Sequence, residues 1–215
     1  SEDPFLSHKR VMSVLFADLR SFTVFCENVD AASVQTVINE FFDACMGALE
    51  KNDATLDKFV GDQVMALFGA PLPNEGHAYE AVKVAVDLQK SIQALRDRWM
   101  ATALLPADLV EAHPNILKLG IGINSGEMLL GMFGSEKANQ YTVLGHHVNL
   151  AARLCSYAAG DEVLASLGTV QEISSYAKIN PGAIQMPIKF RTKAKIEVKG
   201  IAEPVTVATL AYGVV

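Results

Sequence analysis

Two acidic residues, Asp18 and Asp62, stand where each could hold a cation. Asp18 follows a continuous apolar run at residues 11–17, which predicts a buried strand that ends at this carboxylate. Asp62 lies in the turn between two strand-forming runs, residues 55–59 and 63–68, a pattern typical of a hairpin. Because strands fix a turn in space while leaving its side chains open, this position suits a metal ligand. An ordinary solvated carboxylate is the alternative.

Asn149 and Arg153 form a second pair, spaced i and i+4 on a predicted helix that opens at Gly145. The packing stripe of this helix consists of Val148, Ala151, Ala152 and Cys155. The pair therefore lies on a different face, where the guanidinium suits an anion and the amide suits a hydroxyl. A merely solvated face is the alternative, because many exposed arginines bind nothing specific.

Basic side chains near these positions could contact phosphate or a base. Lys58 precedes Asp62 by four residues, at the rim of the same turn. Farther along the chain, a basic stretch contains Lys189, Arg191, Lys193, Lys195 and Lys199. Alternating Lys and Arg usually form the solvated face of a strand. Lys199, next to a glycine and just ahead of a turn, is the best candidate in the stretch for a phosphate contact.

The elements that position these side chains predict an α+β fold. One helical stripe covers residues 34–49, a second covers 78–99, and residues 116–123 predict a further strand. The order strand, helix, strand, strand, helix, strand predicts a ferredoxin-like βαββαβ core, with sheet order 4-1-3-2 and both helices on one face. Asp18 and Asp62 then arrive at the same edge of the sheet.

Beyond this core, the chain is expected to add C-terminal strands and a helix. The expected segments are a strand at 127–133, the helix after Gly145, a loop at 181–187 and a final strand at 205–211. Residues 1–215 fit a single domain, in which residues 1–8 form a polar lead from an upstream linker.

Two carboxylates that converge on one exposed edge repel each other unless a cation lies between them. Oxygen ligands without a neighbouring His or Cys favour Mg²⁺ or Mn²⁺ over Zn²⁺. The segment after Asp18, residues 19–23, is expected to form a loop whose backbone NH groups could cradle phosphate. Metal and phosphate together indicate nucleotide chemistry.

The composition is that of a globular protein, with 50% hydrophobic and 20% charged residues. A net charge of -6 argues against nonspecific nucleic-acid binding. No apolar run approaches the roughly 20 residues that span a bilayer, and no signal peptide is visible. We therefore expect no nucleic-acid partner and no direct membrane insertion. Since the chain lacks an initiator Met, we also expect it to be a fragment of a longer protein.

The cysteines and histidines give little sign of a metal site. The widely spaced Cys26, Cys45 and Cys155 predict reduced thiols and a cytoplasmic location, rather than disulfides or bound zinc. The isolated histidines, His8, His77 and His113, are expected at the surface.

Five segments, taken together, resemble the catalytic domain of class III nucleotidyl cyclases. They are FADLRSFT, DKFVGDQVMALFG, GIGINSGEMLLGMFGSEK, YTVLGHHVNLAARL and VKGIAEPV. Any one of them is weak, but all five stand in one order at compatible intervals and cover about residues 9–212. The resemblance implies the class III cyclase fold. It also implies attack of the ribose 3′-hydroxyl of ATP on the α-phosphate, which yields 3′,5′-cyclic AMP and pyrophosphate.

The resemblance assigns the first half of an active site to the strand end and the hairpin. Asp18 and Asp62 match the two metal-binding aspartates of the family, assisted by the Leu19 carbonyl. They imply two Mg²⁺ or Mn²⁺ ions in each active site. Phe22 and Thr23 match the phosphate-facing loop.

The second half of the site reads the nucleotide. Lys58 and Thr142 match the residues that recognise the purine base; Lys is similar to adenylate cyclases, whereas guanylate cyclases usually place Glu there. Asn149 matches the residue that orients the ribose, Arg153 the one that stabilises the transition state, and Lys199 the one that holds the terminal phosphates. In the family the halves meet only across a head-to-tail dimer, which implies a homodimer with shared active sites.

Thr142 bears on regulation, because it resembles the subgroup in which bicarbonate or CO₂ responsiveness has been described. A hydroxyl can donate or accept, so it discriminates adenine less firmly than an ionised Asp. Two rival functions stay open: a guanylate cyclase, and a non-catalytic partner domain that binds nucleotide or senses bicarbonate. Against the latter, both aspartates and the pair Asn149 and Arg153 occur on this one chain.

Overall fold

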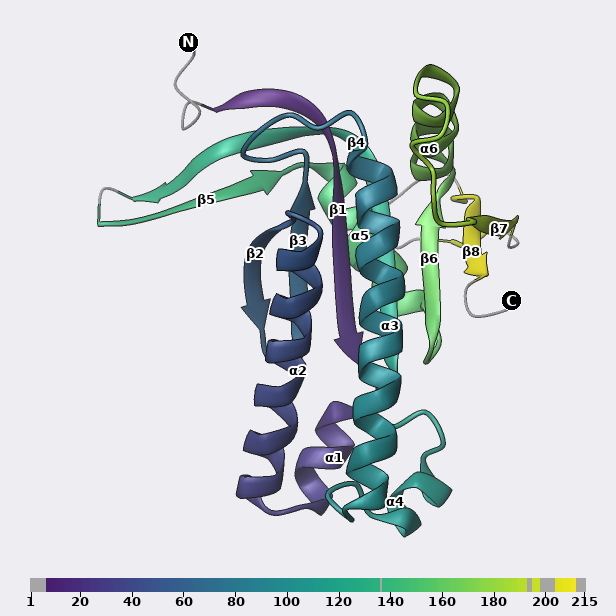
Figure 1. Cartoon of the computed structure of the whole chain (residues 1–215). Coiled ribbons are helices and arrows are strands. Elements are labelled where there is room, and N and C mark those ends of the chain that lie inside the picture. Colours follow the sequence, from purple (N-terminus) through teal and green to yellow (C-terminus); the bar gives the residue numbers. More distant parts are fainter. Residues whose placement is uncertain (1–6, 136, 193–194, 198–203, 212–215) are drawn as a thin grey trace.

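The chain is organised around β1 (His8–Leu19), which lies between β3 and β4 in the middle of the sheet (Figure 1). The structure is a computed structural model and describes residues 7–135, 137–192, 195–197 and 204–211. The core continues with α2 (Ala31–Lys51), β2 (Thr55–Val60), β3 (Gln63–Phe68), α3 (His77–Ala101) and β4 (Leu119–Ser135). The other elements are α1 (Phe22–Asn28), α4 (Ala107–Ala112), β5 (Ala138–Leu144), α5 (His146–Tyr157), β6 (Glu162–Ser166), α6 (Leu167–Ile179), β7 (Lys189–Thr192) and β8 (Val207–Ala211).

The sheet has the strand order β2-β3-β1-β4-β6-β8-β7, and β5 pairs with β4 outside this path. β1 runs antiparallel to both β3 and β4, whereas β4 and β6 are parallel. Helices α2 and α3 cover one face of the sheet, and α5 lies behind the other (Figure 1). The first four strands confirm the predicted ferredoxin-like order and the placement of both core helices on one face.

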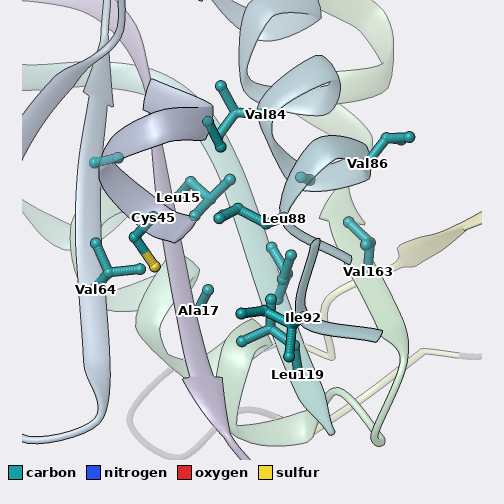
Figure 2. Packing of buried hydrophobic residues seen from close by; sticks show 14 of the residues in the cluster. Leu15, Ala17, Cys45, Val64, Val84, Val86, Leu88, Ile92, Leu119 and Val163 are labelled. Carbon is teal, nitrogen blue, oxygen red and sulfur yellow. The ribbon is translucent and has the colours of Figure 1, made fainter. Parts of the chain in front are cut away.

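Both faces of β1 are buried, because successive side chains of a strand point to opposite sides of the sheet. Leu15 and Ala17 face α2 and α3, in the cluster drawn in Figure 2. Val14 and Phe16 belong to the cluster on the α5 side. A shift of one residue would exchange the two faces, so burial fixes the register of this strand. The strand therefore holds Asp18 at a defined position.

Residues 119–135 form one long strand, β4, rather than the two strands predicted at 116–123 and 127–133. Its pairing with β1 continues without a break through the region between them. A glycine in this strand permits close packing of a helix. A Cβ at Gly122 would lie only 2.1 Å from the backbone nitrogen of Cys155 in α5.

The structure adds elements that the sequence analysis did not predict, and one of them, α1, replaces a predicted loop. Helix α1 begins at Phe22, directly after the end of β1, in the segment expected to cradle phosphate as a loop. β6 and α6 follow α5, and α6 is capped by Ser166, whose side chain accepts a hydrogen bond from the Thr169 amide. β8 begins at Val207, two residues later than the predicted final strand.

His77 is buried, contrary to the surface position that the sequence predicts, and only 5% of it is exposed. It opens α3 where that helix packs on the sheet, and its Nδ1 lies 2.7 Å from the Ser13 hydroxyl of β1. Ser13 in turn lies 2.6 Å from the Ser125 hydroxyl, which donates to Thr169. Burial lowers the pKa of His77 to about 4, so the ring is neutral at pH 7.

Candidate active site

Asp18 and Asp62 come together because β1 and β3 are antiparallel neighbours. In the ladder between these strands, Asp18 stands opposite Gln63, the residue that follows Asp62 in the hairpin turn. The Gln63 side-chain amide donates a hydrogen bond to Asp18 Oδ2 at 3.4 Å. The end of β1 and the tip of the β2–β3 hairpin therefore share one edge of the sheet, as the sequence predicts.

The two carboxyl groups are partly buried, and the charge of Asp18 acts on Asp62. Burial raises the pKa of Asp18, and the Arg20 guanidinium opposes this rise. Burial also raises the pKa of Asp62, and the negative charge of Asp18 raises it further. The backbone NH groups of Asp62 and Leu19 act in the other direction. The electrostatic cost of holding two acids at one edge is thus relieved by nearby donors and by one cation.

That cation, Arg20, is a contact that our sequence reasoning did not identify. Its Nη1 lies 2.9 Å from Asp18 Oδ1, and the side chains of both residues are 19% exposed. The same guanidinium donates from Nη2 to the Cys155 carbonyl in α5. A basic residue two positions after Asp18 is a signal in the sequence, but its partners become evident only from the fold.

The donor atoms at this edge fit a hard divalent cation. Asp18 and Asp62 supply carboxylate oxygens, and the Cys155 thiol donates to Asp18 Oδ2 at 3.6 Å. Burial raises the pKa of the Cys155 thiol, and the negative charge of Asp18 acts in the same direction, so the pair favours a thiol rather than a thiolate beside Asp18. Within the described ranges, no three His, Cys, Asp or Glu residues gather as a metal site. Remaining ligands would come from backbone, water or substrate, as is usual for Mg²⁺.

Lys58 lies beside the β5 strand that carries Thr142. Its ammonium donates to the side-chain oxygen of Gln140 at 3.4 Å and lies 3.4 Å from Asp57 Oδ2. Gln140 and Thr142 are two residues apart on β5 and so share one side of that strand. Thr142 is buried, with 6% exposed. The structure therefore brings the β2 lysine to the strand of the predicted base-reading threonine, and adds Gln140 as a contact that sequence reasoning missed.

Asn149 and Arg153 lie on the side of α5 that faces away from the sheet. The buried side of α5 consists of Leu150, Ala151, Leu154 and Cys155. Asn149 is exposed and Arg153 is half-buried. In the part of the chain that the structure describes, neither side chain has a hydrogen bond or an ion pair, and nothing of this kind joins them to Asp18 or Asp62. Both groups are available to a ligand.

The remaining predicted site residues lie around the end of β1 or beyond the described chain. Leu19 is buried as the last residue of β1. Phe22 and Thr23 lie in the first turn of α1, after Ser21, whose left-handed backbone (φ 55°) turns the chain into the helix. Lys199 lies outside the described residues.

A family model described as the adenylate and guanylate cyclase catalytic domain matches residues 6–210. Adenylate cyclase 1 of Rhizobium meliloti (strain 1021) is 27% identical over 175 residues, which are 80% of this chain and 25% of that protein. An adenylate cyclase of Anabaena cylindrica is 28% identical over 188 residues, 86% of this chain and 35% of that protein. The chain thus spans a quarter to about a third of the length of these curated relatives.

Solved structures show the same likeness over almost the whole chain. The adenylyl cyclase CyaB from P. aeruginosa is 30% identical, with 97% of both chains covered and a TM-score of 0.84. The guanylyl cyclase Cya2 is also 30% identical, with 95% of this chain and 93% of that chain covered and a TM-score of 0.79. The two neighbours differ in the nucleotide that their names imply, so likeness alone does not select ATP or GTP. Within the described residues, none of the helices is both long and apolar enough to cross a membrane.

Proposed function

Because this chain belongs to the family of adenylate and guanylate cyclase catalytic domains, we propose that it is an adenylate cyclase that converts ATP to 3′,5′-cyclic AMP and pyrophosphate. The observation that carries the proposal is the convergence of Asp18 and Asp62 at one edge of the sheet. A non-catalytic partner domain would not need both carboxylates together with Asn149 and Arg153.

Asp18 and Asp62 would hold two Mg²⁺ or Mn²⁺ ions, with the Leu19 carbonyl as a further oxygen ligand. When bound, such cations supply Lewis acidity to the ribose 3′-hydroxyl and neutralise charge on the triphosphate. The chain orients Asp18 through Gln63 and Arg20. Phe22 and Thr23 lie in the first turn of α1, shortly after the end of β1, and would face the phosphates.

Asn149 and Arg153 would act on the nucleotide from α5. The Asn149 amide can hydrogen-bond a ribose hydroxyl and so hold the attacking oxygen in place. The Arg153 guanidinium can stabilise the charge that develops on the α-phosphate, an effect worth about 10³-fold or more in other phosphoryl transfers. Lys199 would hold the terminal phosphates. No side-chain general base is required if the hydroxyl is acidified by metal.

Lys58 and Thr142 favour ATP as the substrate. On its recognition edge, adenine offers a ring-nitrogen acceptor for the Lys58 ammonium and an amino donor for the Thr142 hydroxyl. Gln140 and Asp57 flank the ammonium and limit where it can point. A guanylate cyclase stays the rival, because a lysine can also donate to the carbonyl oxygen of guanine.

The two halves would be completed by a second copy of the chain in a head-to-tail homodimer. Each active site would then combine Asp18 and Asp62 of one protomer with Asn149 and Arg153 of its partner. The position of the α5 pair outside the buried side of the helix supports this arrangement, because Asn149 is exposed and Arg153 is only half-buried. Stimulation by bicarbonate, suggested by Thr142, stays a prediction that activity with and without bicarbonate at fixed pH would test.

The direct test is to incubate the purified chain with ATP and Mn²⁺ at a concentration where light scattering reports a dimer, and to quantify cyclic AMP. GTP is assayed in parallel, and Asp18→Asn serves as the inactive control. Cyclic AMP from ATP, absent with the control, is the expected result. A dimer that makes no cyclic nucleotide contradicts the proposal, and a clear preference for GTP contradicts its choice of substrate.

A further inference from the structure

The guanidinium of Arg20 lies at the metal-binding edge without being one of its ligands. It forms the 2.9 Å ion pair with Asp18 Oδ1, and its positive charge also acts on Asp62. A cation is therefore already paired with Asp18, one of the two acids that would bind a divalent ion. Any divalent ion that binds Asp18 must share this carboxylate with Arg20 or displace it.

Two further features hold the guanidinium in place. Its Nη2 donates to the Cys155 carbonyl in the last turn of α5, where the helix dipole favours a positive charge. It also lies directly over Gly120, which stands opposite Asp18 in β4. A Cβ at Gly120 would lie 1.7 Å from Nη2. The absence of a side chain there creates the space that Arg20 fills.

The geometry points to Arg20 as a built-in counter-cation of Asp18 that competes with divalent metal for the carboxylate and so sets the metal affinity of the site. This inference rests on the function proposed above. Without metal, the ion pair relieves the repulsion between the aspartates and keeps Asp18 oriented. With metal, the guanidinium gives up Asp18 and keeps its bond to the Cys155 carbonyl, which lies on the helix that carries Asn149 and Arg153.

The inference makes an unusual prediction, since removing a side chain next to the metal ligands should strengthen metal binding. Without the competing ion pair and its positive charge, Mn²⁺ should bind Arg20→Gln about three- to tenfold more tightly than it binds wild type. The same change removes the counter-ion when no metal is present. The melting temperature in EDTA should therefore fall, and added Mn²⁺ should raise it by more than it does in wild type.

The experiment measures Mn²⁺ affinity by electron paramagnetic resonance on the full chain without nucleotide, so that turnover plays no part. Gly120→Ala displaces the same guanidinium while leaving all charges in place, and it should also bind Mn²⁺ more tightly. Arg98→Gln is the matched control, because Arg98 is paired with Glu40 between α2 and α3 and should leave the affinity unchanged. An unchanged or weaker affinity in folded Arg20→Gln overturns the inference.

A measurement on wild type covers the case in which the variants fold poorly. The Arg20 Nε atom is buried and has no hydrogen-bond partner among the described residues, so its NH signal should be distinct in a nitrogen-15 spectrum. Saturating Mg²⁺ should move this signal, and a signal that stays in place contradicts displacement. If wild type binds Mn²⁺ but makes no cyclic AMP, the proposed function fails, while the competition between Arg20 and metal is still decided by these binding data.

Discussion

Asp18 is held opposite Gln63 in the antiparallel ladder between β1 and β3, with the Gln63 amide bonded to its carboxylate at 3.4 Å. Since Gln63 directly follows Asp62, this one pairing brings two acids that are remote in sequence to the same edge. The carboxylates are held together by the surrounding fold, and the negative charge of Asp18 raises the pKa of Asp62. Such strain between like charges is typical of functional sites.

Replacing Asp62 with Asn should therefore lower the cyclase activity and raise the melting temperature. Loss of a metal ligand should lower cyclic AMP formation by about 10³-fold, the order expected when metal stabilisation of the transition state is removed. In EDTA the variant should melt about 1–3 °C higher than wild type, because the repulsion with Asp18 is gone. Melting curves and activity assays check both, with Asp43→Asn on the exposed side of α2 as the control. A variant that keeps its activity would contradict the role of Asp62.

Gly122 should tolerate no side chain, whereas Gly47 should accept one. A Cβ at Gly122 would lie 2.1 Å from the Cys155 nitrogen and 2.5 Å from the Ala151 carbonyl oxygen, both backbone atoms of α5. Gly122→Ala should thus cost about 3 kcal/mol or more of unfolding free energy. Gly47 has open space around it in α2, so Gly47→Ala should gain about 0.5–1 kcal/mol. Urea titrations measure both, and equal effects at the two glycines would refute the packing described for α5.

The buried His77 should make stability depend on pH below neutrality. Its pKa is about 4 in the folded chain, against an ordinary value near 6.5. Between these values only the unfolded chain binds the proton, so stability is complete above about pH 6.5 and falls as pH drops towards 4. The loss should reach about 3 kcal/mol. Urea titrations across this range test the dependence, which His77→Gln should flatten and exposed His113→Gln should leave unchanged. A wild-type profile without this decline rules out a buried neutral His77.

Lys58 and Gln140 should control the choice of nucleotide. Lys58→Glu should reduce kcat/KM for ATP by at least about tenfold and lower the ratio of ATP to GTP turnover, since an acceptor replaces a charged donor. Gln140→Ala removes only the partner of the ammonium, so it should raise KM for ATP about threefold with a smaller effect on kcat. Steady-state kinetics with both nucleotides provide the test. An unchanged nucleotide ratio in Lys58→Glu would remove Lys58 from base recognition.

Periodicity and turn chemistry predicted the part of the fold that positions the metal edge. The apolar run that ends at Asp18, the hairpin around Asp62 and two amphipathic helices were enough to derive the sheet order, because few topologies join these elements by short connections. The convergence of the two aspartates followed from that order. These features depend on local patterns, which the sequence carries directly.

Features that depend on close packing between distant elements could not be predicted. The contact of Arg20 with Cys155 requires the space over Gly120, and the buried position of His77 requires Ser13 on a separate strand. The sequence analysis expected two separate strands where β4 is continuous, and glycines of β4 such as Gly120 and Gly122 are positions where another element packs closely. In each case the residue that makes the contact is remote in the chain, and no local sequence pattern indicates the contact.

The central claim, that carboxylates of one protomer work with the guanidinium of another, is tested most directly by mixing two inactive variants. Asp62→Ala lacks a metal ligand and Arg153→Ala lacks the transition-state cation, so each alone should form almost no cyclic AMP. After mixing and subunit exchange, half of the chains should pair as heterodimers in which one of the two sites is intact, and activity should recover to about a quarter of wild type for statistical exchange at equal amounts. Well-folded, exchanged heterodimers that stay inactive would contradict the shared site.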